Sequence, residues 1–296
     1  MNIGLIDIDS HNFPNLAMMK ISAYHKALGD TVEWWIGLKH YDRVYQSKVF
    51  TGEYSPDIDY CIQADEIVKG GTGYGIDNKL PKEIEHMSPD YSLYPKYREA
   101  YGFLTRGCPR NCQFCIVTQK EGKISKQVDD LDGWYRGQRT IKLLDPNLLA
   151  CRDHEKLLQQ LVQSGAWVDF TQGLDARCIT QDNASLIAKV KTKMVHFALD
   201  GMEQEASVRR GLEIYKKITG AEERTARVYI LTNYETTHEE DMYRVKLVQS
   251  LGYWPYVMIY DKPHAPQITR DLQRWSNNPF IYFAEKNFEN YNKKKG

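Results

Sequence analysis

Hydrophobic residues in the larger, second part of the chain recur in short, β-branched runs. These runs begin near Tyr101, Thr140, Trp167, Val195, Arg227 and Pro255. Patterns with helical spacing lie between most of them, over residues 153–164, 180–191, 203–218 and 237–251. One run and its helix have about the length of a βα unit. Six such units are fewer than the eight of a closed TIM barrel, so residues 96–296 are expected to form a partial (βα)6 TIM-type barrel.

The first 95 residues have the pattern of a smaller α/β unit. Strands are expected at Ile3–Ile8, Thr31–Ile36, Arg43–Phe50 and Glu66–Lys69. A helix is expected at Asn15–Leu28, because its apolar residues fall three or four apart and Gly29 follows it. This β-α-β order predicts a Rossmann-like domain. Residues 81–95 contain three prolines without helical spacing and are interpreted as the linker, and the polar residues 287–296 as a frayed tail.

Composition narrows the class of protein. The chain has 296 residues, 42% hydrophobic and 26% charged, which is typical of a soluble globular protein. Its 39 basic and 39 acidic residues balance, so there is no strong sign of a nucleic-acid partner. No apolar run is long enough for a membrane helix, and the first residues lack a signal-peptide pattern. A cytoplasmic protein without a membrane partner is therefore expected.

Three cysteines form a compact motif directly after the first predicted barrel strand. Cys108, Cys112 and Cys115 are spaced C-x3-C-x2-C, so one loop can direct three thiolates at one centre. Loops at the carboxyl ends of barrel strands are where the active sites of such folds lie. A structural zinc site takes four ligands, commonly in two knuckles, and no second knuckle is present. A [4Fe–4S] cluster normally takes four cysteines, so three would leave one iron with an open position.

This loop, with Phe114 just before the last cysteine and the six-fold βα pattern behind it, resembles the radical S-adenosylmethionine (radical SAM) superfamily. The resemblance covers about residues 101–261. It implies that the three cysteines hold a [4Fe–4S] cluster and that S-adenosyl-L-methionine chelates the fourth iron. Reductive cleavage would then yield a 5′-deoxyadenosyl radical that acts on an unidentified substrate, with electrons from a flavodoxin- or ferredoxin-type donor.

The resemblance also implies cofactor-binding residues at the strand ends. The second strand ends in LLDPN where the family usually has a Gly-Gly-Glu type of signature, and Asp145 and Asn147 still offer oxygen ligands there. The expected cofactor-binding residues are Phe114, Asp145, Asn147, Asp175, Arg177, Asp200, Thr232 and Asn233. For the last two, only their position at the end of the fifth strand supports the assignment. Arg106 and Arg110 flank the first cysteine and either favour the reduced cluster or face solvent.

Two alternatives stay open. The first unit weakly resembles cobalamin-binding domains, because Asp9 and His11 match part of the Asp-x-His-x-x-Gly motif, although Pro14 replaces the glycine. A cobalamin-dependent radical SAM methyltransferase is thus one alternative, and a domain of this fold without cobalamin is the favoured interpretation. The other alternative is a non-enzymatic Fe–S or zinc protein that does not bind S-adenosylmethionine.

Two further features are expected to have a structural rather than a chemical role. Cys61, Cys151 and Cys178 have no neighbours with ligand spacing and are expected to be buried and apolar. The GGTGYG segment at residues 70–75 lacks the lysine of a phosphate loop, so a tight turn near the barrel mouth is expected.

Overall fold

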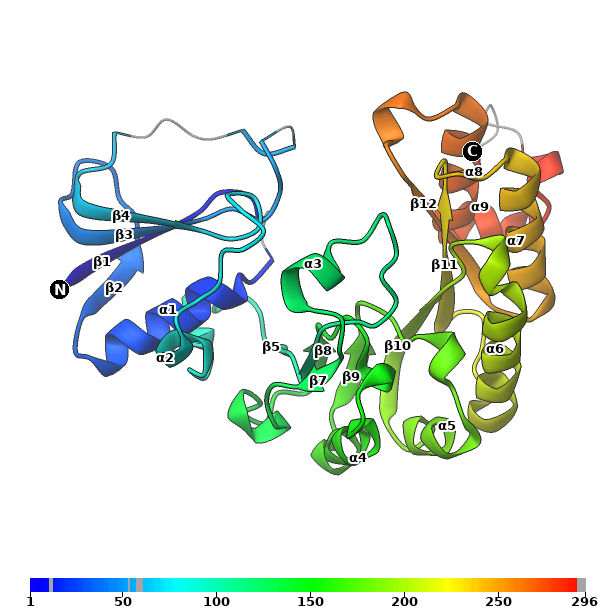
Figure 1. The fold of residues 1–296 in the computed structure, drawn as a ribbon, viewed down its shortest axis with the longest axis horizontal. Helices are drawn as coiled ribbons and strands as arrows, with labels where there is room; N and C mark the ends of the chain where they lie inside the picture. The colour runs from blue at the N-terminus through cyan, green and yellow to red at the C-terminus, as the bar shows by residue number, and fades with distance from the viewer. Residues whose placement is uncertain (11–12, 53, 57–60, 292–296) are drawn as a thin grey trace.

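The computed structural model describes residues 1–10, 13–52, 54–56 and 61–291, which form a mixed α/β structure with two parallel sheets (Figure 1). The first sheet has the strand order β2-β1-β3-β4. Its strands are β1 (Asn2–Asp7), β2 (Thr31–Trp34), β3 (Tyr41–Ser47) and β4 (Ala64–Gly70), all paired in parallel. These four strands confirm the runs expected from the sequence.

Helix α1 (Leu16–Ala27) covers one face of the first sheet, as Figure 1 shows. Asn15 caps it by accepting a hydrogen bond from the Met18 amide, and Gly29 follows it with a φ of +83°. Met18 and Ile21 on the helix pack with Ile3 and Leu5 on β1 in a small core. Among the described residues, only the connection from β1 to β2 contains a helix, so the repeated alternation of a doubly wound domain is not seen there.

The segment expected to be a linker is packed against the first unit. It contains the short helix α2 (Lys82–Glu85), whose Ile84 is buried in the core of that unit. Asp90 accepts hydrogen bonds from Ser22 and Lys26 on α1. A lack of helical periodicity did not reveal these contacts, because they join the segment to residues more than 60 positions away.

The second sheet has six parallel strands in the order β12-β11-β10-β9-β8-β5. They are β5 (Ala100–Gly102), β8 (Thr140–Leu143), β9 (Trp167–Phe170), β10 (Lys191–Ala198), β11 (Ala226–Thr232) and β12 (Trp254–Ile259). This confirms the six predicted β runs. The two edge strands, β5 and β12, do not pair with each other in the described part of the chain, so the sheet is open rather than a closed barrel.

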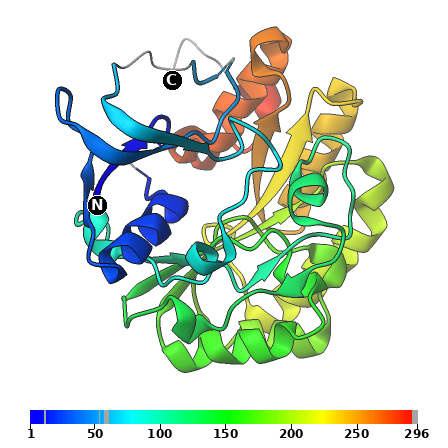
Figure 2. The same cartoon turned by 60° about the vertical axis from the view of Figure 1, so that its left-hand side comes forward.

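Helices cover one face of this open sheet. They are α4 (His154–Ser164), α5 (Gln181–Ile187), α6 (Glu205–Thr219) and α7 (His238–Ser250). Each strand is added on the same side of the previous one, so right-handed crossovers place all the connecting helices on the same face, as Figures 1 and 2 show. Alternate residues such as Ile141, Val168 and Val228 enter the large core between sheet and helices. The residues between them lie on the face that these helices leave uncovered.

The helix expected over residues 237–251 is confirmed, and Thr237 and Glu240 form a capping box at the start of α7. Thr180 and Asn183 form a second capping box at the start of α5, which ends at Ile187, earlier than expected, because β10 begins at Lys191. Local side-chain to backbone bonds therefore determine where these helices begin, whereas the neighbouring strand limits where one of them ends.

Two helices that the sequence analysis did not predict, α8 (Gln267–Asn277) and α9 (Pro279–Ala284), follow β12. Asn277 accepts a hydrogen bond from the Val257 amide at 2.8 Å and donates one to the Val257 carbonyl at 2.9 Å. These bonds cover the free edge of β12. The expected frayed tail is wrong for residues 288–291: the Phe288 ring lies 5.5 Å from that of Trp275, and Tyr291 packs beside Phe288.

Several contacts join the two units. The Tyr91 hydroxyl donates to the Trp134 carbonyl at 3.0 Å, and Arg106 pairs with Glu85 at 3.1 Å. None of the helices in the described residues combines the length and apolar character needed to cross a membrane.

Candidate active site

The cysteine loop is closed at its base by a small antiparallel ribbon. Strand β6 (Thr105–Arg106) pairs with β7 (Lys126–Gln127), so the loop of residues 107–125 begins and ends at this ribbon. Gly107 has a φ of +91°, and a β-carbon there would overlap the Ile124 carbonyl, so this position requires glycine. Helix α3 (Val117–Glu121) lies inside the loop. The ribbon therefore presents the three cysteines on a closed loop next to the carboxyl end of β5.

Asp145, directly after β8, holds the chain leading into this loop. Its carboxylate accepts hydrogen bonds from the Leu104 amide (3.0 Å), the Thr105 amide (2.5 Å) and the Thr105 hydroxyl (2.6 Å). Burial raises the pKa of this carboxyl to about 7, although the three hydrogen bonds oppose the shift. Asp145 was expected to bind the cofactor, but both of its oxygens are occupied by the backbone and side chain that precede the cysteines. Its position makes it a residue that orients the loop.

Cys108, Cys112 and Cys115 are free and partly buried thiols. The Asn147 amide nitrogen lies 3.4 Å from the Cys108 sulfur. Burial raises the pKa of Cys112, Arg177 opposes this shift, and the other two cysteines and Asp200 add to it. All of these groups therefore lie within electrostatic range of Cys112. No three His, Cys, Asp or Glu side chains in the described ranges are arranged to hold a metal ion.

Asp175 links the cysteine loop to the loop after β9. Its carboxylate lies 2.5 Å from Arg110 and 2.7 Å from Arg177, and it accepts a hydrogen bond from Asn147 at 3.1 Å. Burial raises its pKa, but the hydrogen bonds and charges of the two arginines outweigh burial, so the pKa lies below its usual value. Three of the predicted residues (Asn147, Asp175 and Arg177) thus lie together beside Cys108.

Cys178 belongs to the same group, which the sequence analysis did not foresee. Its sulfur lies 3.1 Å from the Arg110 guanidinium. Of the three other cysteines expected to be buried, Cys151 is buried, Cys178 is partly exposed and Cys61 is exposed, so the expectation is confirmed for Cys151 alone. Nothing in the spacing of Cys178 indicates its contact with Arg110, because the contact depends on how two distant loops meet.

The predicted residues Asp200, Thr232 and Asn233, at the ends of β10 and β11, each form a hydrogen bond with a backbone group of a neighbouring strand or loop. Asp200 accepts a hydrogen bond from the Leu231 amide at 3.2 Å, and burial raises its pKa to about 6. Thr232 is fully buried and donates to the Met258 carbonyl, which joins β11 to β12. Asn233 has a φ of +60° and donates to the Tyr260 carbonyl at 2.8 Å. Asp200 lies within electrostatic range of Cys112.

Phe114 lies against an aromatic residue that the sequence analysis missed. Its ring is 5.5 Å from that of Tyr234, which in turn lies 4.8 Å from the Tyr260 ring. These three rings form an aromatic wall between the cysteine loop and the ends of β11 and β12.

Arg244, on α7, is a second residue that the sequence analysis missed. It is fully buried and donates to the carbonyls of Leu199 and Leu231 at 3.0 and 2.9 Å. It therefore fixes the ends of β10 and β11 beside Asp200. Its i, i+3 pairing with Asp241 is a sequence signal that could have revealed it.

The remaining expectations concern the first unit and Arg106. The GGTGYG turn contacts the cysteine loop region, because Lys120 on α3 donates a hydrogen bond to Thr72. His11 lies outside the described residues. Arg106 pairs with Glu85 and Glu121. Of the two arginines that flank Cys108, it is Arg110 that pairs with the predicted site residue Asp175.

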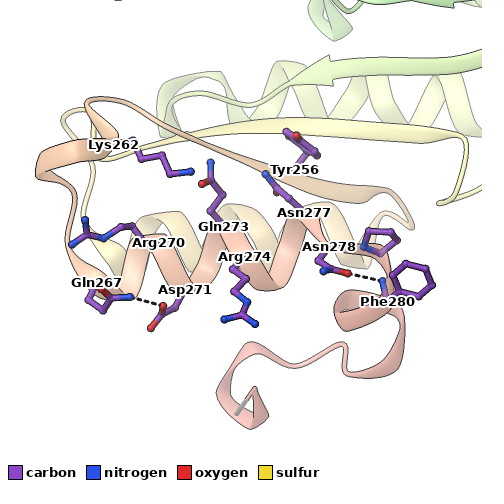
Figure 3. A pocket seen from close by; sticks show the side chains of 11 residues that line it. Tyr256, Lys262, Gln267, Arg270, Asp271, Gln273, Arg274, Asn277, Asn278 and Phe280 are labelled. Atoms are coloured by element: carbon purple, nitrogen blue, oxygen red, sulfur yellow. Dashed lines mark hydrogen bonds between the residues drawn. The ribbon is translucent and has the colours of Figure 1, made fainter. Parts of the chain in front are cut away.

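A pocket on the molecule lies elsewhere, along α8 (Figure 3). Polar side chains such as Lys262, Arg270 and Gln273 line it, together with the aromatic Phe280. None of the predicted site residues belongs to it. Tyr256 is the one residue of the second sheet that lines this pocket, among the residues that the structure describes.

Neither the models of known protein families nor the curated proteins give a match to this chain.

Proposed function

We propose that this chain is a radical SAM enzyme, in which the six-stranded sheet is a partial (βα)6 barrel and the first unit a Rossmann-like domain. The observation that carries the proposal is the C-x3-C-x2-C motif on a closed loop at the carboxyl end of β5. Parallel strands in sequential order bring the ends of β8, β9 and β10 to the same edge of the sheet. Asn147, Asp175, Arg177 and Asp200 come from those ends.

The donor set fits a [4Fe–4S] cluster. Thiolates are the usual ligands of such clusters, and three of them leave one iron open for S-adenosylmethionine. Cys108, Cys112 and Cys115 would hold the cluster, since they are free, partly buried and electrostatically coupled. When bound, the cluster and S-adenosylmethionine supply the reductive cleavage that yields a 5′-deoxyadenosyl radical.

The surrounding residues have distinct roles in this proposal. Asn147 donates a hydrogen bond toward the Cys108 sulfur, and such bonds tune reduction potentials. The cations of Arg110 and Arg177 lie close to the cysteines and favour negative charge there. Asp145 holds the base of the loop, and the aromatic wall of Phe114, Tyr234 and Tyr260 lines the side of the loop that faces β11 and β12. An electron donor of the flavodoxin or ferredoxin type is the partner that this chemistry requires.

The test is anaerobic reconstitution with iron and sulfide, followed by reduction and addition of S-adenosylmethionine. We expect about four irons per chain, an electron paramagnetic resonance spectrum that the cofactor perturbs, and 5′-deoxyadenosine detected by mass spectrometry. Cys112→Ala should abolish both the cluster and the product. Cys61→Ser is the matched control, because this exposed thiol lies outside the motif, and it should retain both.

Two results would contradict the proposal. A cluster that S-adenosylmethionine does not perturb, without formation of deoxyadenosine, would support the non-enzymatic Fe–S protein. Zinc bound in place of iron would support a zinc protein. Corrin binding by the whole chain, measured by its absorption spectrum, would instead identify the cobalamin-dependent methyltransferase.

A further inference from the structure

The uncovered face of the second sheet carries a row of polar residues, one from each of its six strands. This polar row consists of Tyr101, Lys142, Asp169, His196, Tyr229 and Tyr256. Tyr101 pairs with Lys142 and Lys142 with Asp169 in the strand register, as Tyr229 does with Tyr256. The His196 ring stacks on that of Tyr229 at 5.0 Å with an interplanar angle of 8°.

Polar residues at these positions are unusual for a parallel sheet, whose strands are normally covered on both faces and apolar throughout. Here the neighbouring residues of the same strands, such as Leu143, Phe170 and Ile230, enter the core beneath the helices. The polar row therefore lies on the opposite face, half-buried in the middle of the sheet. Since α4–α7 all lie on the other side, these helices leave the row uncovered, and Lys142, Asp169, Tyr229 and Tyr256 are partly exposed there.

The two charges at the centre of the row do not neutralise each other. Lys142 and Asp169 are direct cross-strand neighbours of opposite charge, which usually form an ion pair. Within the described residues neither forms one. The Lys142 ammonium instead lies 5.5 Å from the centre of the Tyr101 ring and 5.9 Å from that of Phe13.

Other polar atoms of this face also lack partners. The Tyr101 hydroxyl and one oxygen of Asp169 are buried and form no hydrogen bond. Tyr101 as a whole is only 5% exposed. The Nε of Arg227, beside the row on β11, is a third such atom. A buried polar atom without a partner costs free energy, and a ligand that supplies the missing partner recovers it.

His196 completes the set of groups that a ligand would meet. Its Nδ1 lies 3.3 Å from the Phe170 carbonyl, so Nδ1 carries the proton and Nε2 is left as an acceptor. Burial lowers the pKa of this imidazole and so favours its neutral form. Beyond it, the rings of Tyr229 and Tyr256 lie 5.5 Å apart and lead to the pocket in Figure 3, which Tyr256 also lines.

We infer that the polar row binds a free α-amino acid, with the ammonium group of the ligand at Asp169 and its carboxylate at Lys142. Neighbouring strands are about 4.8 Å apart, so one small molecule with both charges on a single carbon can reach both side chains. The Tyr101 hydroxyl would donate to the ligand carboxylate. The ligand side chain would lie along His196, Tyr229 and Tyr256. That this amino acid is the substrate rests on the proposed function, whereas its binding does not.

The test is calorimetric titration of the full chain with each of the standard L-amino acids, without S-adenosylmethionine. It is carried out on protein with and without the reconstituted cluster. We expect at least one amino acid to bind, and its N-acetyl and α-amide derivatives to bind at least tenfold more weakly. These two derivatives each remove one charge from the ligand and require no change in the protein.

Variants then assign the contacts. Asp169→Asn and Lys142→Met should each weaken binding at least tenfold, and Asp169→Glu should recover part of the loss. The matched controls Asp132→Asn and Lys189→Met remove exposed charges away from the polar row and should change affinity less than twofold. Thermal melting of each variant checks that it is folded.

The inference is overturned if no amino acid binds, if the derivatives bind as tightly as the parent, or if the variants of the polar row behave like the controls. Displacement of the amino acid by S-adenosylmethionine from protein without a cluster would also overturn it, because the row would then bind the amino-acid group of the cofactor. Deoxyadenosine formation without amino-acid binding would refute only this inference. Amino-acid binding without deoxyadenosine formation would refute only the proposed function.

Discussion

The Arg110 guanidinium lies 2.5 Å from the Asp175 carboxylate and joins two loops that are 65 residues apart in the sequence. Arg177 donates a hydrogen bond to the other oxygen of the same carboxylate at 2.7 Å. Asp175 is thus the common partner of a cation on the cysteine loop and a cation on the loop after β9. This contact joins the cysteine loop to the loop that follows β9.

Replacement of Asp175 should destabilise the fold. The Asp175 side chain is nearly buried. Asp175→Ala therefore leaves the guanidinium groups of Arg110 and Arg177 without their counter-ion. We expect a loss of about 2 kcal/mol in the free energy of unfolding, less than for a fully buried pair because both arginines are partly exposed. Urea denaturation measures it. Glu289→Ala, which removes an exposed ion pair with Lys246, is the control and should cost less than about 0.5 kcal/mol. Equal losses in the two variants would contradict the prediction.

Asp145 should make stability depend on pH. Its folded-state pKa of about 7 lies above the ordinary value of 3.8, so between these two values the folded chain holds a proton that the unfolded chain has released. Stability from this group is therefore complete below about pH 4 and falls as the pH rises to about 7. In Asp145→Asn this dependence should be absent. As the pH rises from about 4 to about 7, the wild type should therefore lose stability relative to the variant. Denaturation at several pH values measures it, and a constant difference would refute the assignment.

Gly211 on α6 should not tolerate alanine. A β-carbon at this buried position would overlap the carbonyl oxygen of Ala176, in the turn that carries Arg177 and Cys178. Alanine favours a helix by about 1 kcal/mol over glycine. We nevertheless expect Gly211→Ala to lower stability by about 1–3 kcal/mol, because the helix must move away from this turn. Gly70→Ala is the control, since nothing lies near its β-carbon position, and it should be almost neutral. Thermal melting distinguishes the two, and a stabilised Gly211→Ala would show that the turn yields easily.

Asn277 should protect the edge of the second sheet. Asn277→Leu removes both hydrogen bonds to Val257. The amide of this edge strand is then left without a partner, whereas Gln273 still donates to the Val257 carbonyl at 3.2 Å. We expect a loss of about 1–3 kcal/mol and association of the chains through this edge. Urea denaturation and size-exclusion chromatography measure the two effects. The control is Asn287→Leu, which removes only a local turn contact. A monomeric Asn277→Leu of unchanged stability would show that α8 covers the edge without this side chain.

Several features were predictable because their causes are local. The alternation of Ile141, Lys142 and Leu143 is visible in the sequence, and so is the capping box of Thr237 and Glu240. The three cysteines of the motif are likewise adjacent enough to be recognised together. Strands, helix starts and the cysteine loop were therefore found at or near their predicted places.

Other features depend on which distant segments meet. No periodicity in the sequence connects the residues that form these contacts. They are the pairing of β6 with β7, the contacts of Arg110 with Asp175 and Cys178, and the hydrogen bond from Thr105 to Asp145. The polar row is an intermediate case. Each of its residues alternates with core residues in its own strand, but only the strand register places Lys142 beside Asp169. The sequence by itself thus determined the elements and the candidate cysteine ligands, because these follow from local spacing. Only the tertiary structure decided the partners of each charged side chain, because pairing depends on distances between elements that the chain brings together when it folds.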